Sequence, residues 1–148
     1  MRLPYQILAI PYRKKGDELS FCVLHRNDCD QWQFVAGGGE EGETILQSAK
    51  REIFEEAGIT TDNIIELKSM CYIPTSVFPD DYLNFWPEDT YIVPEYAFAF
   101  ECNQEIALSH EHGEYRWLSY KEAYKLLYWD SNRTALFELN CRLKGRRK

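Results

Sequence analysis

The chain has 148 residues, and a chain of this length buries roughly 70% of its unfolded surface without help from a disulfide or a metal. A content of 45% hydrophobic and 28% charged residues excludes a disordered chain. The net charge of −7 argues against stable nucleic-acid binding through a basic face, although a divalent metal can still join carboxylates to phosphates. We expect one domain over residues 1–148.

Three β-prone segments come first in the chain, at residues 5–12, 19–25 and 32–36. Turn residues at positions 14–17 separate the first two segments, which predicts a β-hairpin. The third segment is expected to end at the glycines 37–39, because glycine is a strong local break in a strand pattern.

The clearest helix prediction lies between Thr44 and Gly58. Thr44 and Gln47 have the spacing of a capping box, in which each side chain accepts a hydrogen bond from the other's backbone. Ala49 and Ile53 recur at helical spacing on one face, and Gly58 favours the end of the helix.

The second half of the chain mixes strands, helices and one long loop. Strands are predicted at residues 64–72, 91–102 and 115–118, and helices at residues 120–129 and 132–143. Residues 74–89, with three prolines, predict an ordered loop that acts as a substrate lid. An exposed edge strand at residues 91–100 would permit a homodimer. Because strands and helices do not alternate strictly, we expect an α+β fold with a mixed sheet between helices.

Five cysteines without a CxxC pair predict free thiols and neither a disulfide framework nor a zinc site. No stretch approaches ~18 consecutive apolar residues, so no membrane partner is expected. The apolar run that ends at Pro11 is too short for a secretory signal. These features predict a cytoplasmic protein.

Three glutamates stand out on the predicted helix, because Glu52, Glu55 and Glu56 lie at positions i, i+3 and i+4. At this spacing the carboxylates share one side of the helix and repel one another by ~0.2–0.5 kcal/mol per pair. A hard divalent cation would turn that repulsion into coordination. The alternative is a solvated acidic face.

The residues before the helix add to this pattern. The glycines allow the backbone to approach a ligand closely, and Gly38 is the candidate contact among them. Glu43 suits the positive end of the helix dipole. Glu43 can also pair with Arg51, about two turns further on, and so brace the loop against the helix.

Together these residues match the pattern Gly-x5-Glu-x7-Arg-Glu-U-x-Glu-Glu-x-Gly-U over residues 37–59, where U is a bulky aliphatic residue. This pattern is the Nudix box, and the chain therefore resembles the Nudix hydrolases. The resemblance implies an α/β/α sandwich around a mixed sheet and hydrolysis of a phosphoanhydride bond in a small molecule. It also implies Mg²⁺ as the cofactor, with Mn²⁺ as a substitute.

The resemblance assigns roles to individual residues. Glu52, Glu55 and Glu56 would hold the metal, together with a backbone carbonyl at Ala36 or Gly37. In the same comparison Glu43 and Arg51 would brace the loop and the helix as part of the catalytic machinery. One of the carboxylates would take a proton from the attacking water, and family members differ in which residue does so.

A second run resembles the bacterial dihydroneopterin triphosphate and (d)NTP pyrophosphatases within this family. Residues 109–118 read Ser-His-Glu-His-Gly-Glu-Tyr-Arg-Trp-Leu, and that group has a glutamate and a histidine before a Tyr-Lys-Trp strand. The comparison makes Glu111 a further metal ligand or the base, with Glu114 as the rival. His110 and His112 could be extra metal ligands or partners of the base, but surface positions are expected for both.

Three further residues match the same group and are candidates for substrate binding. Arg26 could contact phosphate, and Trp32 could stack on a pterin or purine ring or lie half-buried in the sheet. Arg133 could reach phosphate, or the run Ser131-Asn132-Arg133 could simply cap a helix. The chain departs from many members in having Ala36 where they have proline.

These observations favour a pyrophosphohydrolase that cleaves a dATP-like nucleoside triphosphate or dihydroneopterin triphosphate to the monophosphate and pyrophosphate. Water would attack phosphorus in this reaction. The alternative is a Nudix enzyme for dinucleoside polyphosphates, nucleotide sugars or RNA 5′ ends. A catalytically silent ligand-sensing domain is a third hypothesis, but the intact acids argue against it because such domains tend to lose them.

Overall fold

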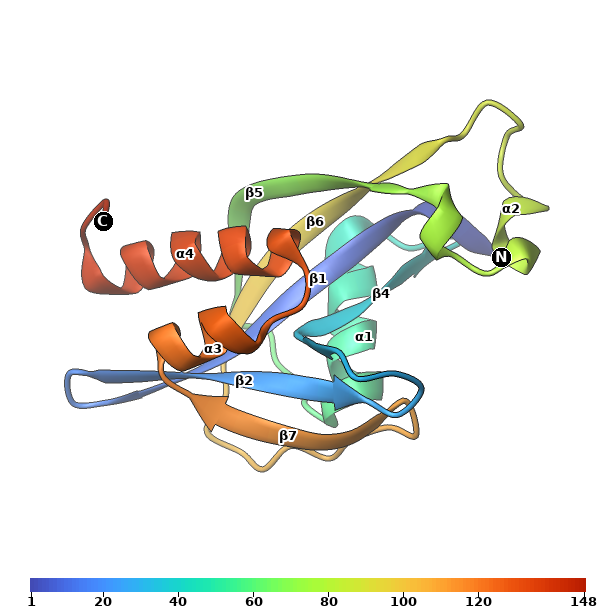
Figure 1. Cartoon of the computed structure of the whole chain (residues 1–148). Helices are drawn as coiled ribbons and strands as arrows, with labels where there is room; N and C mark the ends of the chain where they lie inside the picture. The colour runs from blue at the N-terminus through green and yellow to red at the C-terminus, as the bar shows by residue number, and fades with distance from the viewer.

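Seven strands form one mixed sheet in the computed structural model, which describes residues 1–148 (Figure 1). The strands are β1 (Arg2–Lys15), β2 (Glu18–Arg26), β3 (Trp32–Gln33), β4 (Val35–Glu40), β5 (Ile64–Pro74), β6 (Ile92–Glu101) and β7 (His112–Leu118). The helices are α1 (Ile45–Ala57), α2 (Asp80–Leu83), α3 (Tyr120–Leu126) and α4 (Asp130–Lys144), and η1 (Thr75–Val77) is a 3-10 turn. β1 and β6 are parallel, and the other strand pairs are antiparallel.

The long strand β1 changes its partner along its length. β4 pairs with the first part of β1, from Arg2 to Ala9, whereas β2 pairs with its last part, from Tyr12 to Lys15. On its other side β1 pairs with β6. β2 and β4 therefore diverge from a common strand, and the main cavity of the molecule takes residues from both.

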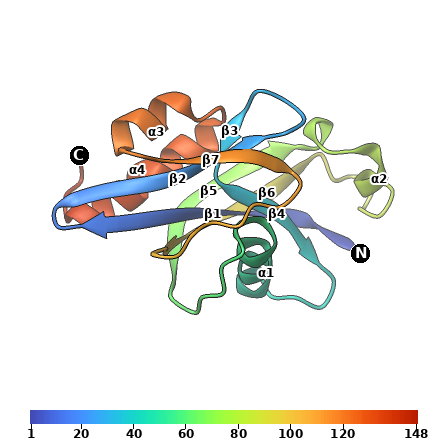
Figure 2. The ribbon, with the colours of Figure 1, turned by 90° about the horizontal axis from the view of Figure 1, so that it is seen from below.

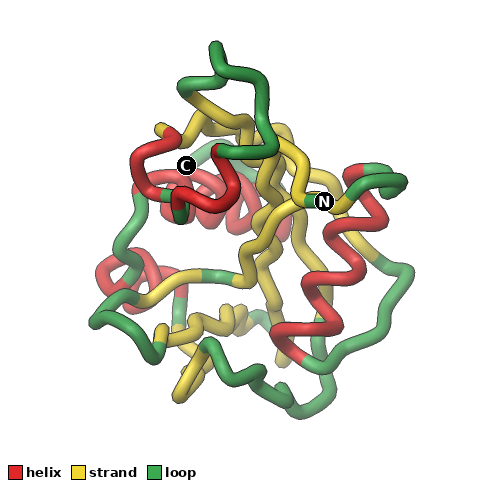
Figure 3. The backbone as a smooth tube through the Cα atoms, turned by 90° about the vertical axis from the view of Figure 1, so that its right-hand side faces the viewer, coloured by secondary structure: helices red, strands yellow, loops and turns green.

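Helices cover both faces of the sheet (Figure 2). On one face α1 places Ala49 and Ile53 in a buried apolar cluster with Ile7 of β1. On the other face α4 places Leu136 and Leu139 in a second buried cluster. Figure 3 shows α1 on one side of the central strands and α4 on the other. The predicted α+β fold, with a mixed sheet between helices, is confirmed.

The sequence signals at the ends of α1 are confirmed. The Thr44 side chain accepts a hydrogen bond from the backbone N–H of Gln47 at 3.2 Å, and the Gln47 side chain accepts from the Thr44 N–H at 2.8 Å. Gly58 ends the helix with a φ of 70°, a conformation that glycine adopts without a steric penalty. These two caps fix the helix that carries the glutamates.

The predictions for residues 37–39 and for residues 74–89 need correction. The glycines 37–39 lie inside β4 and do not end a strand, because their missing side chains leave room for Glu52, Arg2 and Tyr5. Residues 74–89 are not a plain loop, since β5 extends to residue 74 and η1 and α2 follow it.

The C-terminal helices also differ from the prediction. α3 ends at Leu126, and α4 begins at Asp130, two residues earlier than expected. Ser131 and Asn132 therefore lie inside the first turn of α4 and do not cap it. The Asn132 side chain instead accepts a hydrogen bond from the backbone N–H of Phe34 at 2.9 Å, which ties α4 to the segment between β3 and β4.

The predicted exposed edge at residues 91–100 is wrong, because β6 lies between β1 and β5. β5 pairs with β6 along both halves of the strand, with a register shift between Glu66 and Met70. The composition of a strand does not specify how many neighbours it has, so this placement could not be derived from β6 alone. None of the helices is both long and apolar enough to cross a membrane.

Candidate active site

A cavity of about 1230 Å³ brings together segments that are far apart in the sequence. Its lining comes from β1, β2, β4, α1, β5, β6, the residues before β7 and the start of α4. The η1 and α2 segment lines the same space through Val77, Phe78 and Tyr82. The segment predicted as a lid therefore lies against the cavity that holds the acidic residues of α1.

The three glutamates of α1 line this cavity. Glu52 and Glu56 are buried, with 8% and 3% of their surface exposed, whereas Glu55 is exposed. Glu56 Oε2 accepts a hydrogen bond from the backbone N–H of Ala36 at 2.8 Å. A Cβ atom at Gly37 would lie 2.0 Å from Glu52 Cδ. The missing side chain of Gly37 therefore allows β4 to approach the carboxyl groups closely.

Burial raises the pKa of both buried glutamates. The pKa of Glu52 rises to about 7, because burial penalises its charged form more than the neighbouring Arg51 favours it. The pKa of Glu56 lies well above its ordinary value, first because of burial and then because of the charge of Glu52. Two such carboxyl groups favour either bound protons or a cation that offsets their charge.

Arg51 braces the loop and the helix as the sequence predicted. It donates to Glu43 through Nε at 2.7 Å and to the Gly38 carbonyl through Nη2 at 2.6 Å. Its Nη1 donates to Glu52 at 2.7 Å and to Glu55 at 3.2 Å. The Arg51 hydrogen bonds hold the pKa of Glu43 at about 2, so this pair is charged at neutral pH.

The segment before β7 faces α1 across the cavity, and Asn27 holds it in place. The backbone N–H of Asn27 donates to the Glu111 carbonyl at 2.9 Å, and its side-chain amide donates to the His110 carbonyl at 2.6 Å. Glu111 lines the cavity. Its rival Glu114 does not line it, because it lies on β7 beside Arg116 at 3.5 Å.

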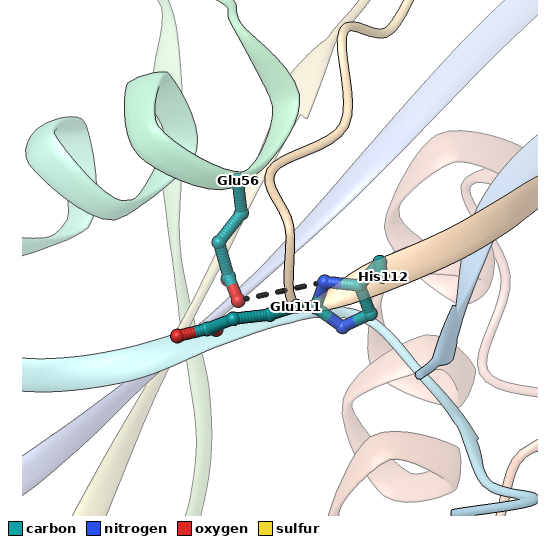
Figure 4. A group of neighbouring side chains, drawn as sticks. All are labelled: Glu56, Glu111 and His112. Atoms are coloured by element: carbon teal, nitrogen blue, oxygen red, sulfur yellow. Dashed lines mark ion pairs between the residues drawn. The ribbon is translucent and has the colours of Figure 1, made fainter. Parts of the chain in front are cut away.

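His112 lies inside the molecule, and the expected surface position is wrong. Its side chain is 1% exposed, and Nδ1 lies 3.8 Å from Glu56 Oε1 (Figure 4). Both ring nitrogens lack a hydrogen-bond partner. Burial lowers the pKa of His112, although the charge of Glu111 opposes the shift. His112 is the first residue of β7 and is the register partner of Arg26 at the end of β2.

The cluster of Glu56, Glu111 and His112 fits a divalent cation. One ligand atom from each residue lies within 4.8 Å of the other two, and Figure 4 shows the three side chains converging from α1 and the facing segment. Carboxylate oxygens suit Mg²⁺ and Mn²⁺. A bound cation would also offset the charge of the buried Glu56 and take one of the two unpartnered ring nitrogens of His112. The donor set is therefore compatible with a metal centre.

Of the four residues predicted to contact substrate, one lines the cavity. Arg26 does so, at the end of β2, where it pairs with Asp28. Trp32 is buried beneath Arg116, whose Cζ lies 4.6 Å from the ring centre. Arg133 pairs with Asp130 on α4, outside the lining.

Gly38 is also outside the lining, since its carbonyl accepts from Arg51 and its Cα faces Arg2. The substrate contacts predicted for Gly38, Trp32 and Arg133 stay predictions, since none of the three residues lines the cavity. Each of these residues already has a structural partner within the chain.

Three residues that the sequence did not single out also line the cavity: Arg2, Gln6 and Glu95. Arg2 and Gln6 lie on β1, and the sequence of this segment indicates a strand but no binding site. Glu95 did carry a signal, because it is a lone acid inside the otherwise apolar run of β6, from Ile92 to Phe100. Such a residue is either paired or functional.

Glu95 makes the stability of the protein depend on pH. Burial raises its pKa from the ordinary 4.5 to about 7, and the hydroxyl of Ser131 opposes the shift. The native state therefore holds this proton more tightly than the unfolded chain, so the stabilisation is present below pH 4.5 and is lost as the pH rises to about 7.

We expect the variant Glu95→Gln to have a free energy of unfolding on the order of 3 kcal/mol above that of the wild type at pH 8, since each pKa unit corresponds to about 1.36 kcal/mol. At pH 4 the two proteins should differ little from this cause. Urea unfolding at the two pH values measures the difference. An equal pH dependence in both proteins would show that Glu95 does not titrate in this way.

The fold and the site are together compatible with a hydrolase of phosphoanhydride bonds. The sequence matches the NUDIX domain over residues 2–139, and the chain belongs to this family of hydrolases. The enzyme is accordingly a pyrophosphatase, in a family whose members generally use divalent metals.

Relatives of known name cover nearly the whole chain. It is 31% identical over 144 residues to the dihydroneopterin triphosphate diphosphatase of Escherichia coli K12, with 90% of this chain and 89% of the relative covered. It is 29% identical over 123 residues to the asymmetrical bis(5′-nucleosyl)-tetraphosphatase of Sus scrofa, with 81% and 78% covered. A crystal structure of a Nudix hydrolase from Listeria monocytogenes is 47% identical, with a TM-score of 0.84 and coverage of 97% and 96%.

Proposed function

We propose that this enzyme uses Mg²⁺ to hydrolyse a dATP-like nucleoside triphosphate or dihydroneopterin triphosphate to the monophosphate and pyrophosphate. The observation that carries the proposal is the buried pair Glu52 and Glu56, which faces Glu111 and His112 in one large cavity. The likeness to the dihydroneopterin triphosphate diphosphatase of Escherichia coli supports the choice of substrate class. Residues 1–148 would act as one domain.

The α1 glutamates would hold the metal, as Glu52, Glu55 and Glu56 line the cavity beside the backbone of Ala36 and Gly37. When bound, Mg²⁺ neutralises charge on phosphate oxygens and lowers the pKa of water. The protein supplies position, because β4 and α1 are locked together by the bond from Ala36 to Glu56.

Glu111 would take the proton from the attacking water. It stands on a segment separate from α1, and Figure 4 shows its side chain beside that of Glu56, with ligand atoms of the two within 4.8 Å of each other. Two hydrogen bonds from Asn27 hold the backbone of this segment. A fixed position matters because a general base must lie within hydrogen-bond reach of the proton that it abstracts. Arg26, also in the lining, would contact a phosphate group.

A second candidate is a dinucleoside polyphosphate. The cavity of about 1230 Å³ exceeds the roughly 300–1,000 Å³ of most small-ligand sites. Aromatic side chains line it at two places, which are β5 with the segment after it (Tyr72, Phe78 and Tyr82) and the residues before α4 (Tyr128 and Trp129). Two aromatic platforms in one large cavity suit a ligand with two bases. The likeness to the Sus scrofa tetraphosphatase agrees with this reading.

Chromatography of the products separates these candidates. We expect the purified protein with Mg²⁺ to convert triphosphates to monophosphate and pyrophosphate, and EDTA to stop the reaction. A dinucleoside tetraphosphate cleaved faster than any triphosphate, to a triphosphate and a monophosphate, would establish the second candidate instead. If no triphosphate, dinucleotide or nucleotide sugar is cleaved with Mg²⁺ or Mn²⁺, both proposals are wrong.

A further inference from the structure

Glu95 is a buried carboxyl group that is not among the proposed metal ligands. It is 5% exposed, lies in the middle of β6 and lines the large cavity. It takes part in none of the ion pairs of the chain. A buried acid without a cationic partner costs free energy unless something donates hydrogen bonds to it. The hydroxyl of Ser131 donates to Glu95, and a ligand in the cavity can provide further donors.

The register of the sheet places a hydrogen-bond donor beside Glu95. Gln6 of β1 is the residue opposite Glu95 of β6 in the parallel pair. Neighbouring strands lie ≈ 4.7–4.9 Å apart, and opposite residues project from the same face. Both side chains line the cavity, so they lie next to each other on its floor.

Arg2 orients Gln6 so that its amide nitrogen is left for a ligand. Arg2 Nη2 donates to Gln6 Oε1 at 2.6 Å, which occupies the carbonyl end of the amide. Arg2 is itself held by Tyr82, whose ring centre lies 4.5 Å from Arg2 Cζ. The floor of the cavity therefore presents two acceptor oxygens from Glu95 and, one strand away, N–H donors from Gln6.

We propose that Glu95 and Gln6 read the base of the substrate, and that they select the 2-amino-4-oxopyrimidine edge shared by guanine and the pterins. This inference rests on the proposed function and narrows its substrate class to dihydroneopterin triphosphate and guanine nucleotides, in preference to dATP-like nucleotides. The edge in question carries two adjacent N–H groups followed by a carbonyl oxygen. The two N–H groups would donate to the Glu95 carboxylate, and Gln6 would donate to the carbonyl oxygen.

The chemistry of the carboxylate favours this edge over others. Two parallel N–H donors match the two oxygens of a carboxylate, as they do in an arginine fork. Adenine offers one amino donor next to a ring nitrogen that accepts, and this acceptor would face the negative oxygens of Glu95. A purine with the wrong edge leaves buried polar groups unpaired, which makes discrimination strong.

The walls of the cavity suit a flat ring above this floor. Phe78 and Tyr82 line it from the segment after β5, and Tyr128 and Trp129 line it from the start of α4. Aromatic rings stack on any base. The aromatic walls would therefore contribute affinity for any base, and Glu95 and Gln6 would determine which base is preferred.

The test compares GTP, ITP, ATP and dihydroneopterin triphosphate as substrates of the wild type and of Glu95→Gln, with Mg²⁺ present. ITP lacks the 2-amino group and isolates one of the two hydrogen bonds. We expect the wild type to have a kcat/KM about 10- to 100-fold higher for GTP and dihydroneopterin triphosphate than for ATP, with ITP between them, as for a good bidentate contact to a base. In Glu95→Gln the ratio for GTP over ATP should fall by a similar factor, through KM.

Glu101→Gln is the matched control, because Glu101 is an exposed acid at the end of the same strand. It should keep the wild-type preference. An ATP preference in the wild type, or a GTP preference that Glu95→Gln leaves intact, would overturn the inference while the proposed function still stands.

Calorimetry measures the affinities for GMP and AMP, and so compares guanine with adenine without turnover. Tighter binding of GMP that weakens in Glu95→Gln supports the inference even if the wild type hydrolyses no triphosphate. Equal binding of the two nucleotides contradicts it.

Discussion

Replacing Glu56 with glutamine should lower kcat by roughly 10³-fold or more, which is the order of effect seen when a major electrostatic contribution to catalysis is removed. The amide oxygen of glutamine can still accept the hydrogen bond from Ala36, which spans 2.8 Å in the wild type. Burial already raises the pKa of Glu56 well above its ordinary value, so a neutral amide costs the fold little. Pyrophosphate release and the melting temperature measure the two quantities.

Metal binding gives a second readout of the same change. A cation that binds the native state alone raises the melting temperature, so Mg²⁺ or Mn²⁺ should stabilise the wild type and not Glu56→Gln. Glu66→Gln is the matched control, since Glu66 is an exposed acid on β5 outside the cavity. Wild-type turnover by Glu56→Gln, or an undiminished metal-induced shift, would show that Glu56 does not hold the metal.

The second large effect should come from Arg51→Met. One guanidinium bonds Glu43 at 2.7 Å, Glu52 at 2.7 Å and the Gly38 carbonyl at 2.6 Å. Methionine keeps the unbranched apolar part of the side chain and removes the donor from these two carboxylates, from the carbonyl and from the exposed Glu55. We expect a loss of about 2–4 kcal/mol in the free energy of unfolding, because uncompensated buried charge is costly. Activity should fall by at least about tenfold, because Glu52 loses its anchor.

Arg142→Met provides the comparison for this variant. Arg142 pairs with Glu138 at 2.7 Å on α4, and its side chain is 39% exposed. An exposed pair of this kind is worth about 0–1 kcal/mol, and it is far from the cavity lining. Urea unfolding of both variants measures the difference. Equal losses in the two proteins would mean that Arg51 is an ordinary surface arginine.

Much of the acidic side of the cavity could be predicted because its sequence signals are local. Thr44 and Gly58 define the two ends of α1, and the spacing of Glu52, Glu55 and Glu56 then decides which way the carboxylates point. The salt bridge from Glu43 to Arg51 could be derived in the same way, since both residues belong to one loop and one helix.

The substrate side could not be predicted as well, because tertiary pairing decides it. Trp32 and Arg133 have the right chemistry for ligand contact, but partners within the chain occupy both. Glu95 and Gln6 meet only because β6 lies parallel to β1. No local pattern in either strand specifies that register, so the pairing of Glu95 with Gln6 could not be predicted from the sequence.

The proposed hydrolysis is tested most directly by ³¹P NMR of the products formed from dATP, GTP or dihydroneopterin triphosphate in ¹⁸O-labelled water. We expect monophosphate and pyrophosphate, with one product carrying the label, formed only when Mg²⁺ is present and not by Glu56→Gln. Diphosphate with orthophosphate as the products, or cleavage that continues in EDTA, would contradict it.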